Sequence, residues 1–342
     1  MIITKTPFRI SFFGGGTDYP VWFQENGGSV LASTINRYCH ITCRYLPPFF
    51  AHRSRIVYSN VEHVNSNEDI AHPAVRAALK FMDIQEGVEL HYDGDLPART
   101  GLGSSSAFTV GLLHAFYALT QTMPTKSQLA QEAIHLEQNV LKESVGCQDQ
   151  ILAAYGGLVR INFNSSSNGH PHAFQLSPVV IHREKLRELQ NHLMLFFTGF
   201  QRTASEIAQE QIQRTRERTR ELKRMQEMVD EAIAILSNKS DLSDFGRLLH
   251  QSWQIKRSLT SKISTPEIDR IYETALQAGA DGGKILGAGG GGFMLLFAAP
   301  ERHALIREKL GSLLHVPFQF ESAGSQVIFH SSEWNSQDDG VL

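Results

Sequence analysis

Two glycines and three consecutive serines stand directly before an apolar helical pattern in this chain. Residues 97–107 read Pro-Ala-Arg-Thr-Gly-Leu-Gly-Ser-Ser-Ser-Ala, and the helical pattern runs over residues 107–119. Because glycine has no Cβ, the N–H groups of Gly101 and Gly103 can turn toward an anion. The start of a helix adds unpaired N–H donors and the positive end of the helix dipole. The segment predicts a phosphate-binding loop, with a serine-capped helix after a turn as the alternative.

The composition indicates a globular protein of two lobes. With 342 residues, 42% of them hydrophobic, the chain can bury a full core. The net charge of −3 gives no bulk attraction to nucleic acid or to an anionic membrane, so we expect neither as a partner. There is no run of ~18 apolar residues to span a bilayer and no signal-peptide pattern at the start, so we expect a cytoplasmic protein.

The three cysteines do not suggest disulfides. Cys39 and Cys43 lie four residues apart in a segment that alternates like a strand, which separates them by ~13 Å. This exceeds the limit of ~7 Å between bridged Cα atoms. We expect reduced, buried thiols.

Basic residues gather in residues 214–224, where six basic and two acidic residues occur. A nucleic-acid patch is one interpretation. We favour a solvated helix face, because no aromatic residues alternate with the charges.

The pattern of the chain predicts a mixed α+β protein. In the first half we expect strands at residues 5–13, 29–45 and 88–92, helices at 72–82 and 125–143, and a hairpin of 158–164 with 173–181. In the second half we expect helices at 201–237, 241–259, 265–279 and 301–314, and strands at 284–286, 293–297, 316–320 and 326–330.

A second glycine-rich run covers residues 287–292, Gly-Ala-Gly-Gly-Gly-Gly. It matches the dinucleotide fingerprint G-x-G-x-x-G formally, but an apolar strand follows where that fingerprint requires a helix. The run predicts a loop between two strands that packs closely against another loop or a ligand.

Two carboxylates indicate phosphoryl transfer. Glu137 lies on a predicted helix, and Asp149 follows twelve residues later in Val-Gly-Cys-Gln-Asp-Gln. Phosphoryl transfer needs one carboxylate to hold magnesium, another to take a proton from the attacking hydroxyl, and a nearby cation. Surface acids are the alternative for each. A serine hydrolase is not predicted, because the three serines lack the second glycine of a nucleophile elbow.

Three motifs, in order and over nearly the whole chain, resemble those of the GHMP kinases, which include galactokinase and the homoserine, mevalonate and phosphomevalonate kinases. They are the loop at 97–107, the N-terminal Pro-Phe-Arg-Ile-Ser-Phe-Phe-Gly-Gly-Gly-Thr-Asp-Tyr at 7–19, and the glycine run with its preceding strand at 284–293. The resemblance implies an α+β, two-lobed fold. An N-terminal α/β lobe, residues 1–180, would carry the phosphate loop, and a ferredoxin-like C-terminal lobe, residues 181–342, would close the cleft.

The resemblance also implies roles for individual residues. ATP would contact the phosphate loop, and Mg²⁺ would be held by Ser105 and Glu137. Asp149 would be the catalytic base, Arg9 the cation beside it, and Asp18 a ligand of sugar hydroxyls. The expected nucleotide-binding residues are Pro97, Gly101, Leu102, Gly103, Ser104, Ser105 and Ser106.

Departures from galactokinase indicate a different sugar. Galactokinase's Glu-His is replaced by Gly15-Gly16, which leaves room for a larger or phosphorylated substrate. The Gly-Gly-Gly-Thr-Asp-Tyr-Pro stretch, the run at 198–202 and Trp253-x-x-Lys256 resemble the D-glycero-D-manno-heptose 7-phosphate kinases of the GDP-heptose route to surface polysaccharide. The substrate residues then expected are Gly15, Gly16, Thr17, Asp18, Asp149, Arg202, Lys256 and Gly290, with Arg202 and Lys256 as anchors of the substrate phosphate.

Two other readings stay open. In the first, the chain would be a fucokinase- or galactokinase-like kinase of an unphosphorylated sugar. In the second, it would be a non-catalytic sugar sensor of the same fold. Asp149, Glu137, Ser105 and Arg9 together argue against the sensor, because it needs none of the transfer chemistry. The oligomeric state is not fixed by the sequence, and a homodimer is one option.

Overall fold

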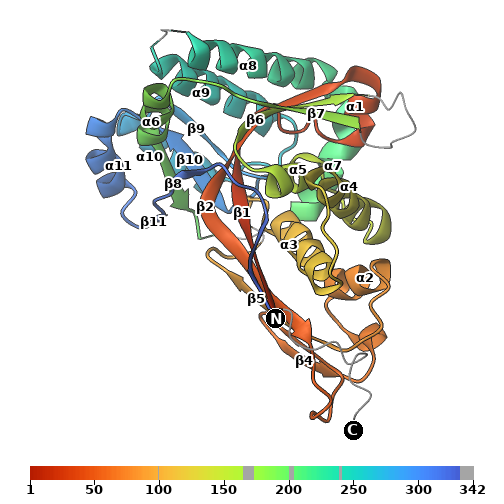
Figure 1. Cartoon of the computed structure of the whole chain (residues 1–342). Helices are drawn as coiled ribbons and strands as arrows, with labels where there is room; N and C mark the ends of the chain where they lie inside the picture. Colours follow the sequence, from red (N-terminus) through yellow and green to blue (C-terminus); the bar gives the residue numbers. More distant parts are fainter. Residues whose placement is uncertain (99, 165–172, 200–203, 239–240, 332–342) are drawn as a thin grey trace.

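The computed structural model describes residues 1–342 except 99, 165–172, 200–203, 239–240 and 332–342. Two long antiparallel strands, β1 (Ile2–Phe13) and β2 (Gly28–Tyr45), form the spine of a large sheet (Figure 1). Strand β2 is long enough to pair with β1 and also with three further strands, one at each end and one between them. The other strands of this sheet are β3 (Ser54–Val57), β4 (Val61–Val64), β5 (Val88–Gly94), β6 (Leu158–Asn164), β7 (Ala173–Pro178), β12 (Phe320–Glu321) and β13 (Gln326–His330).

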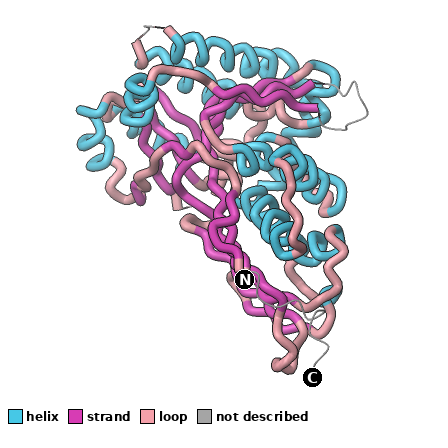
Figure 2. The backbone as a smooth tube through the Cα atoms, viewed as in Figure 1, coloured by secondary structure: helices cyan, strands magenta, loops and turns pink. Residues whose placement is uncertain are grey.

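Helices cover one face of this sheet. Figure 2 shows the helices of this lobe to the right of the long β1–β2 ribbon, whereas the small sheet described below lies to its left. Helix α3 (Ser104–Leu119) packs directly on β1 and β2, and its residues from Ser106 to Leu113 are all buried. This explains its nearly continuous apolar sequence. The other helices of this lobe are α1 (Pro20–Asn26), α2 (Pro73–Phe81), α4 (Lys126–His135) and α5 (Gln148–Tyr155), with a 3₁₀ turn at Asn67–Asp69.

The second lobe is built on a small antiparallel sheet with the strand order β11-β8-β10-β9. This is the order of a βαββαβ, ferredoxin-like unit, as expected. Its strands are β8 (Leu193–Phe197), β9 (Gly282–Ile285), β10 (Phe293–Phe297) and β11 (Leu314–His315). Its helices are α6 (Arg183–His192), α7 (Ala204–Arg214), α8 (Thr219–Ser237), α9 (Ser243–Ser258), α10 (Pro266–Gln277) and α11 (His303–Lys309).

The last two strands lie elsewhere than expected. We expected the strands at residues 316–320 and 326–330 to complete the second lobe. Instead β12 pairs with β2, and β13 pairs antiparallel with β1, with Ile2 opposite His330. The edge of β1 offers unpaired N–H and C=O groups, and β13 satisfies them. The chain therefore passes through the second lobe and returns to the first sheet.

Several predicted helices are present but interrupted. The helix expected at 125–143 is α4, capped by Thr125 as predicted, followed by a π-helical turn at Leu136–Val140. The helix expected at 201–237 is divided into α7 and α8 by a 3₁₀ turn at Thr215–Arg218. The one expected at 301–314 begins as a 3₁₀ turn and ends earlier, at Lys309.

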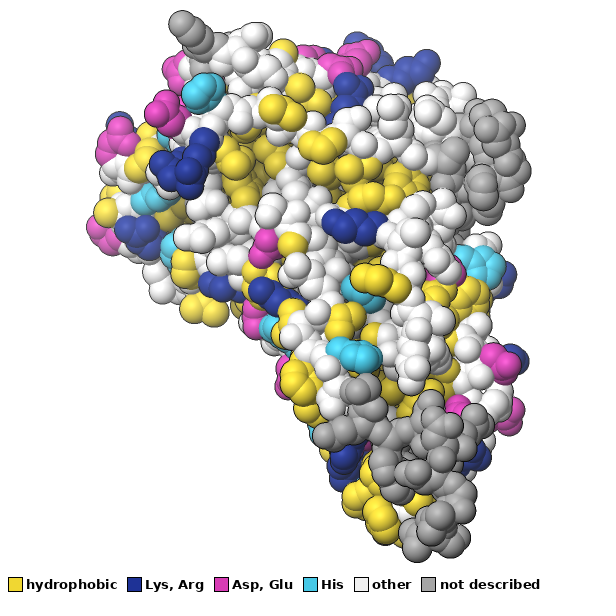
Figure 3. All heavy atoms as spheres, viewed as in Figure 1, with side chains coloured by type: hydrophobic (Ala, Val, Ile, Leu, Met, Phe, Trp, Pro, Cys, Tyr) yellow, Lys and Arg dark blue, Asp and Glu magenta, His cyan; other side chains and the backbone are white. Residues whose placement is uncertain are grey.

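The charged run lies on the surface. Arg224 on α8 forms ion pairs with Glu227 and Glu231 of the same helix. Figure 3 shows side chains of both charges gathered along the upper edge of the molecule, where α8 lies. Because the basic residues alternate with acids there, this is a solvated helix face. Cys39, Cys43 and Cys147 are buried free thiols. Among the described residues, no helix combines the length and apolar character that a membrane span requires.

Candidate functional site

A cavity of about 360 Å³ lies where the two lobes meet. Its walls come from the phosphate loop, the end of β1, the segment before α5, and helices α7 and α9. The loop between β9 and β10 completes it. The expected site residues found in its lining are Arg9, Gly15, Gly16, Asp18, Gly101, Gly103, Ser104, Ser105, Ser106, Asp149 and Lys256.

The two glycine-rich loops pack against each other, backbone to backbone. A Cβ on Gly101 would lie 2.3 Å from the carbonyl oxygen of Leu286, and one on Gly287 would lie 2.5 Å from the Cα of Gly101. Phe293 donates its N–H to the carbonyl of Thr100 at 3.2 Å. This confirms the prediction of a close-packed loop between strands. Gly101 has φ +85°, a left-handed conformation that favours glycine.

Two residues of the expected phosphate loop support it through hydrogen bonds to their carbonyl groups and do not line the cavity. Leu102 is buried in the core, and its carbonyl accepts the N–H of Arg9 at 3.0 Å. Pro97 is exposed, and its carbonyl accepts the hydroxyl of Thr100 at 2.8 Å. Neither is among the described residues that line the cavity. Ser104, Ser105 and Ser106, in contrast, form the first turn of α3 and face it.

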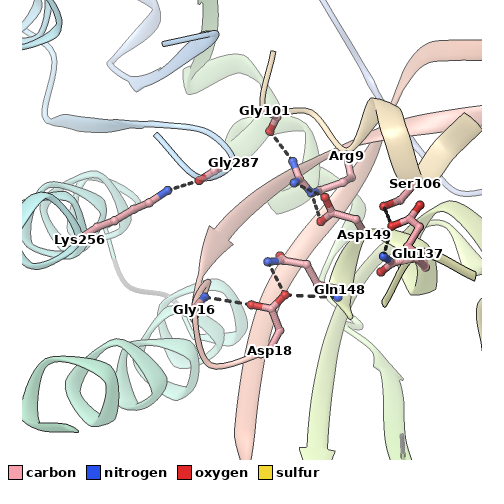
Figure 4. Close-up of polar contacts among 11 residues, drawn as sticks. Arg9, Gly16, Asp18, Gly101, Ser106, Glu137, Gln148, Asp149, Lys256 and Gly287 are labelled. Carbon is pink, nitrogen blue, oxygen red and sulfur yellow. Dashed lines mark hydrogen bonds and ion pairs between the residues drawn. The ribbon is translucent and has the colours of Figure 1, made fainter. Parts of the chain in front are cut away.

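Arg9 and Asp149 form a bidentate ion pair in the cavity (Figure 4). The Nε of Arg9 donates to Oδ1 of Asp149 at 2.7 Å, and Nη2 donates to Oδ2 at 2.6 Å. Nη1 donates to the carbonyl of Gly101 at 2.6 Å. Arg9 comes from β1 and Asp149 from the first turn of α5, so the guanidinium joins the phosphate loop to the carboxylate. Such paired, charge-assisted hydrogen bonds fix both groups in orientation.

Glu137 lies in the π-helical turn and is fully buried. Its Oε2 accepts hydrogen bonds from the hydroxyl of Ser106, at 2.9 Å, and from the amide of Gln150. Its Oε1 has no hydrogen bond of standard geometry within the described part of the chain, although the Thr109 hydroxyl lies close enough to stabilise the charged carboxylate. Burial raises the pKa of this carboxyl to about 7. A carboxylate oxygen beside serine hydroxyls fits the hard-oxygen preference of Mg²⁺. The serine that contacts Glu137 is Ser106, whereas Ser105 is exposed toward the cavity.

Asp18 is buried and held by three donors. Its Oδ1 accepts the N–H of Gly16 at 3.0 Å, and its Oδ2 accepts the side-chain amide of Gln148 at 3.0 Å and, at 3.4 Å, its backbone N–H. Burial and the nearby charge of Asp149 raise its pKa. Gly146 must be glycine here, because a Cβ would lie 1.9 Å from Oδ2 of Asp18. Thr17 is buried and is not among the described residues that line the cavity; its hydroxyl donates to the carbonyl of Gly14 at 2.8 Å and to that of Ser29, on β2, at 3.0 Å.

The two glycines that replace galactokinase's Glu-His behave differently. A Cβ on Gly16 would lie 2.6 Å from the amide nitrogen of Gln211, so α7 fills the space that Gly16 leaves. Among the described atoms, a Cβ on Gly15 would meet only the Oγ of Ser11 at 3.7 Å and the Nε2 of Gln148 at 3.9 Å. Only Gly15 therefore opens the pocket.

Two buried lysines face the cavity from the second lobe. Lys256 donates to the carbonyls of Ile285, at 3.2 Å, and Gly287, at 2.5 Å. Burial lowers its pKa to about 8. Lys284 donates to the carbonyl of Phe12 at 2.8 Å, and burial together with the charge of Lys256 lowers its pKa well below the usual value. Lys284 was not predicted, although it opens the glycine motif in the sequence.

Two further residues that we expected at the site are not found among the described residues that line the cavity. Gly290 donates its N–H to the carbonyl of Ile263 at 2.9 Å and is not among the described lining residues. Arg202 lies outside the described residues. Gln211 and Ala208, which do line the cavity, were missed. Their helix is rich in polar residues, and such a composition predicts exposure to solvent rather than contact with a loop.

Comparison with known proteins places these features in a family. The model of the GHMP kinases N-terminal domain matches residues 70–157, and the model of the GHMP kinases C-terminal domain matches residues 231–315. Together they cover just over half of the chain.

Similar proteins include a D-glycero-α-D-manno-heptose 7-phosphate kinase of Campylobacter jejuni, 28% identical over 88% of this chain and 90% of that protein. A bifunctional fucokinase/GDP-fucose pyrophosphorylase of Arabidopsis thaliana is 25% identical over 90% of this chain and 31% of its own length. The crystal structure of a D-glycero-D-manno-heptose 1-phosphate kinase from Bacteroides thetaiotaomicron has the same fold, with a TM-score of 0.76, 23% identity and coverage of 97% and 100%.

Proposed function

Because the chain belongs to the GHMP kinase family, we propose that it transfers the γ-phosphoryl group of ATP to the anomeric hydroxyl of D-glycero-D-manno-heptose 7-phosphate. The products would be ADP and the 1,7-bisphosphate. One observation carries this proposal: the Arg9–Asp149 pair, joined to the phosphate loop through Gly101, faces a cavity that also holds Asp18.

Asp149 is the proposed catalytic base. Both of its oxygens accept hydrogen bonds from Arg9, so the carboxylate is held in one orientation. It would accept the proton of the acceptor hydroxyl while that oxygen attacks phosphorus. The guanidinium of Arg9 would face the charge that develops on the transferred group. Positioned proton transfer of this kind contributes typically ~10²–10⁴-fold to rate.

The start of α3 is the proposed nucleotide-phosphate site. Its first N–H groups and the hydroxyls of Ser104 and Ser105 face the cavity. Glu137 and Ser105 would hold Mg²⁺, with Ser106 orienting the Glu137 carboxylate. Bound Mg²⁺ supplies positive charge to the phosphate oxygens of ATP.

The acceptor would lie between Asp18 and the second lobe. The named activity of the Campylobacter relative and the opening at Gly15 support a heptose phosphate. Lys256 is the proposed anchor for the phosphate that the acceptor carries. Arg202, which is not described, remains a second candidate for that role.

The proposal is tested by assaying the purified protein with ATP, Mg²⁺ and a panel of sugars and sugar phosphates. We expect the highest kcat/KM on D-glycero-D-manno-heptose 7-phosphate. Equal or better kcat/KM on fucose would support the fucokinase alternative, which the Arabidopsis relative favours. Sugar binding without phosphoryl transfer to any member of the panel would support the sensor.

The proposal also includes the location of the protein in the cell, its division into domains and its oligomeric state. We place the reaction in the cytoplasm, in line with the buried, free thiols of Cys39, Cys43 and Cys147. The division of the chain near residue 180 and the option of a homodimer also stay predictions, which limited proteolysis and light scattering would test.

A further inference from the structure

Two polar atoms in the cavity wall have no partner within the described part of the chain. They are the hydroxyl oxygen of Ser11, a residue 6% exposed on β1, and Oε1 of Gln148 at the start of α5. Both residues line the cavity. Buried polar groups in folded proteins are almost always hydrogen-bonded, so each such exception requires an explanation. Here, the two exceptions belong to side chains in the wall of the same cavity.

The orientation of the Gln148 amide is fixed by its neighbour. Nε2 donates to Oδ2 of Asp18 at 3.0 Å (Figure 4), and the opposite orientation would set two acceptors against each other. Oε1 is therefore the atom left for a ligand, and it can only accept a hydrogen bond.

The gap beside Gly15 lies against both side chains, next to the Oγ of Ser11 and the amide nitrogen of Gln148. A Cβ placed on Gly15 would be 3.7 Å from the Oγ of Ser11 and 3.9 Å from the Nε2 of Gln148, which are ordinary contact distances. The backbone of Gly15 does not have a positive φ, so this position does not require glycine for conformational reasons. The residue leaves room for an atom of a ligand in contact with both side chains.

We propose that Ser11, Gln148 and the gap beside Gly15 form a subsite for one ring hydroxyl of the acceptor, distinct from the hydroxyl that receives the phosphate. This deepens the proposed function and rests on it. A hydroxyl can donate to Oε1 of Gln148 and accept from the hydroxyl of Ser11, which satisfies both atoms. A phosphate group does not fit, because Oε1 of Gln148 and the carboxylate of Asp18 would repel it. The subsite thus selects a sugar by a hydroxyl near the reacting end.

The test is a kinetic comparison of Ser11→Ala with the wild type. The substrates are D-glycero-D-manno-heptose 7-phosphate and its forms in which one ring hydroxyl is replaced by hydrogen. We expect kcat/KM for the parent sugar to fall about 3- to 10-fold, with the KM for ATP and the melting temperature unchanged. For one deoxy form, wild type and variant should be equal, because the partner of Ser11 is already missing.

Ser252→Ala is the matched control. Ser252 on α9 is also fully buried with an unpartnered hydroxyl in the described structure, but it is not among the described residues that line the cavity. We expect it to leave the kinetics with every sugar unchanged. An equal loss by Ser11→Ala on all deoxy forms, or no loss on the parent, would overturn the inference.

Gly15→Ala tests the same subsite if Ser11→Ala does not fold. The added methyl group would occupy the gap without backbone strain, so we expect a raised KM for the sugar and an unchanged melting temperature. An unchanged KM would contradict the subsite. If the wild type phosphorylates a different sugar, the proposed substrate is wrong, and the subsite is judged with the deoxy forms of that sugar. If it phosphorylates none, the proposed function fails, and binding of the heptose phosphate and its deoxy forms, by calorimetry without ATP, decides on the subsite.

Discussion

The proposed nucleotide end and the proposed acceptor end of the cavity are built in opposite ways. The proposed phosphate loop is a run of consecutive residues that would bind through its own backbone and the first turn of α3. The acceptor end is assembled from side chains on β1, α5, α7 and α9, far apart in the sequence. A local loop keeps its function as long as its backbone geometry survives. An assembled pocket changes its substrate when any one of its contributors changes, which is how one fold can serve different acceptors.

The sharpest way to separate the two ends is Asp149→Asn. We expect turnover to fall by about 10²–10⁴-fold, because the amide cannot take the proton of the acceptor hydroxyl. ATP binding, measured by calorimetry, should remain. Asp244→Asn on α9 controls for the exchange itself, because this half-buried carboxylate pairs with Arg247 and is not among the described residues that line the cavity. Near-normal turnover would exclude Asp149 as the base.

Glu137→Gln tests the nucleotide end. Loss of the carboxylate charge should raise the Mg²⁺ concentration needed for half-maximal activity by roughly tenfold or more. Glu132→Gln, on α4 before the π-helical turn, makes the same chemical change where the side chain bonds Tyr117 instead. It should leave the Mg²⁺ titration unchanged. Equal titrations for wild type and Glu137→Gln would contradict the metal site.

A pH profile tests whether Lys256 belongs to the acceptor end. Burial lowers its pKa to about 8, so the ammonium is lost as the pH rises above this value. We expect kcat/KM for the heptose phosphate to fall about tenfold between pH 7 and pH 9, relative to that for unphosphorylated mannose. The ratio cancels the titration of groups that act on both sugars. Parallel profiles for the two sugars would rule out Lys256 as the phosphate anchor.

The smallest effect concerns the contact between the glycine loops. Gly101→Ala and Gly199→Ala both place a side chain at positive φ, +85° and +78°. Only the first meets backbone, at 2.3 Å, whereas Gly199 has no described atom within 4 Å of the added carbon. We expect Gly101→Ala to be the more destabilising by about 1 kcal/mol or more in urea unfolding. An equal loss of unfolding free energy in the two variants would mean that the contact between the glycine loops does not contribute to stability.

The features that the sequence predicts correctly are the local ones, and those that it does not predict depend on residues far apart in the chain. The loop at 97–107, the close packing of the second glycine run and the Thr125 cap depend on neighbouring residues, and the structure confirms these structural features. The pairing of β13 with β1 joins residues more than 300 positions apart, and no local pattern encodes it. Gln211 was missed for a related reason. A polar residue on a helix is normally predicted to be exposed to solvent. Here the side chain of Gln211 instead lies against the loop at Gly16, and this contact is visible only in three dimensions.

Ser11 is a residue whose role cannot be predicted from the burial pattern of its strand. On β1 it stands between Ile10 and Phe12, which are both buried, so the sequence does not reveal which neighbour its hydroxyl has. Only the three-dimensional structure places Ser11 in the cavity wall beside Gly15 and Gln148, with no partner for its hydroxyl among the described residues. Lys284 is similar, since its ammonium is held by the carbonyl of Phe12 from the other lobe.

The return of β12 and β13 to the first sheet has a consequence for synthesis on the ribosome. Residues 193–315 contain every strand of the small sheet in the described structure, so that sheet can form as soon as they emerge. The large sheet must wait for residues 320–330. Until then the outer edge of β1 is unpaired, and an unpaired edge invites strands of other chains. A nascent chain that stalls before residue 320 would be a target for chaperones, although it already contains Arg9, Asp149 and Lys256.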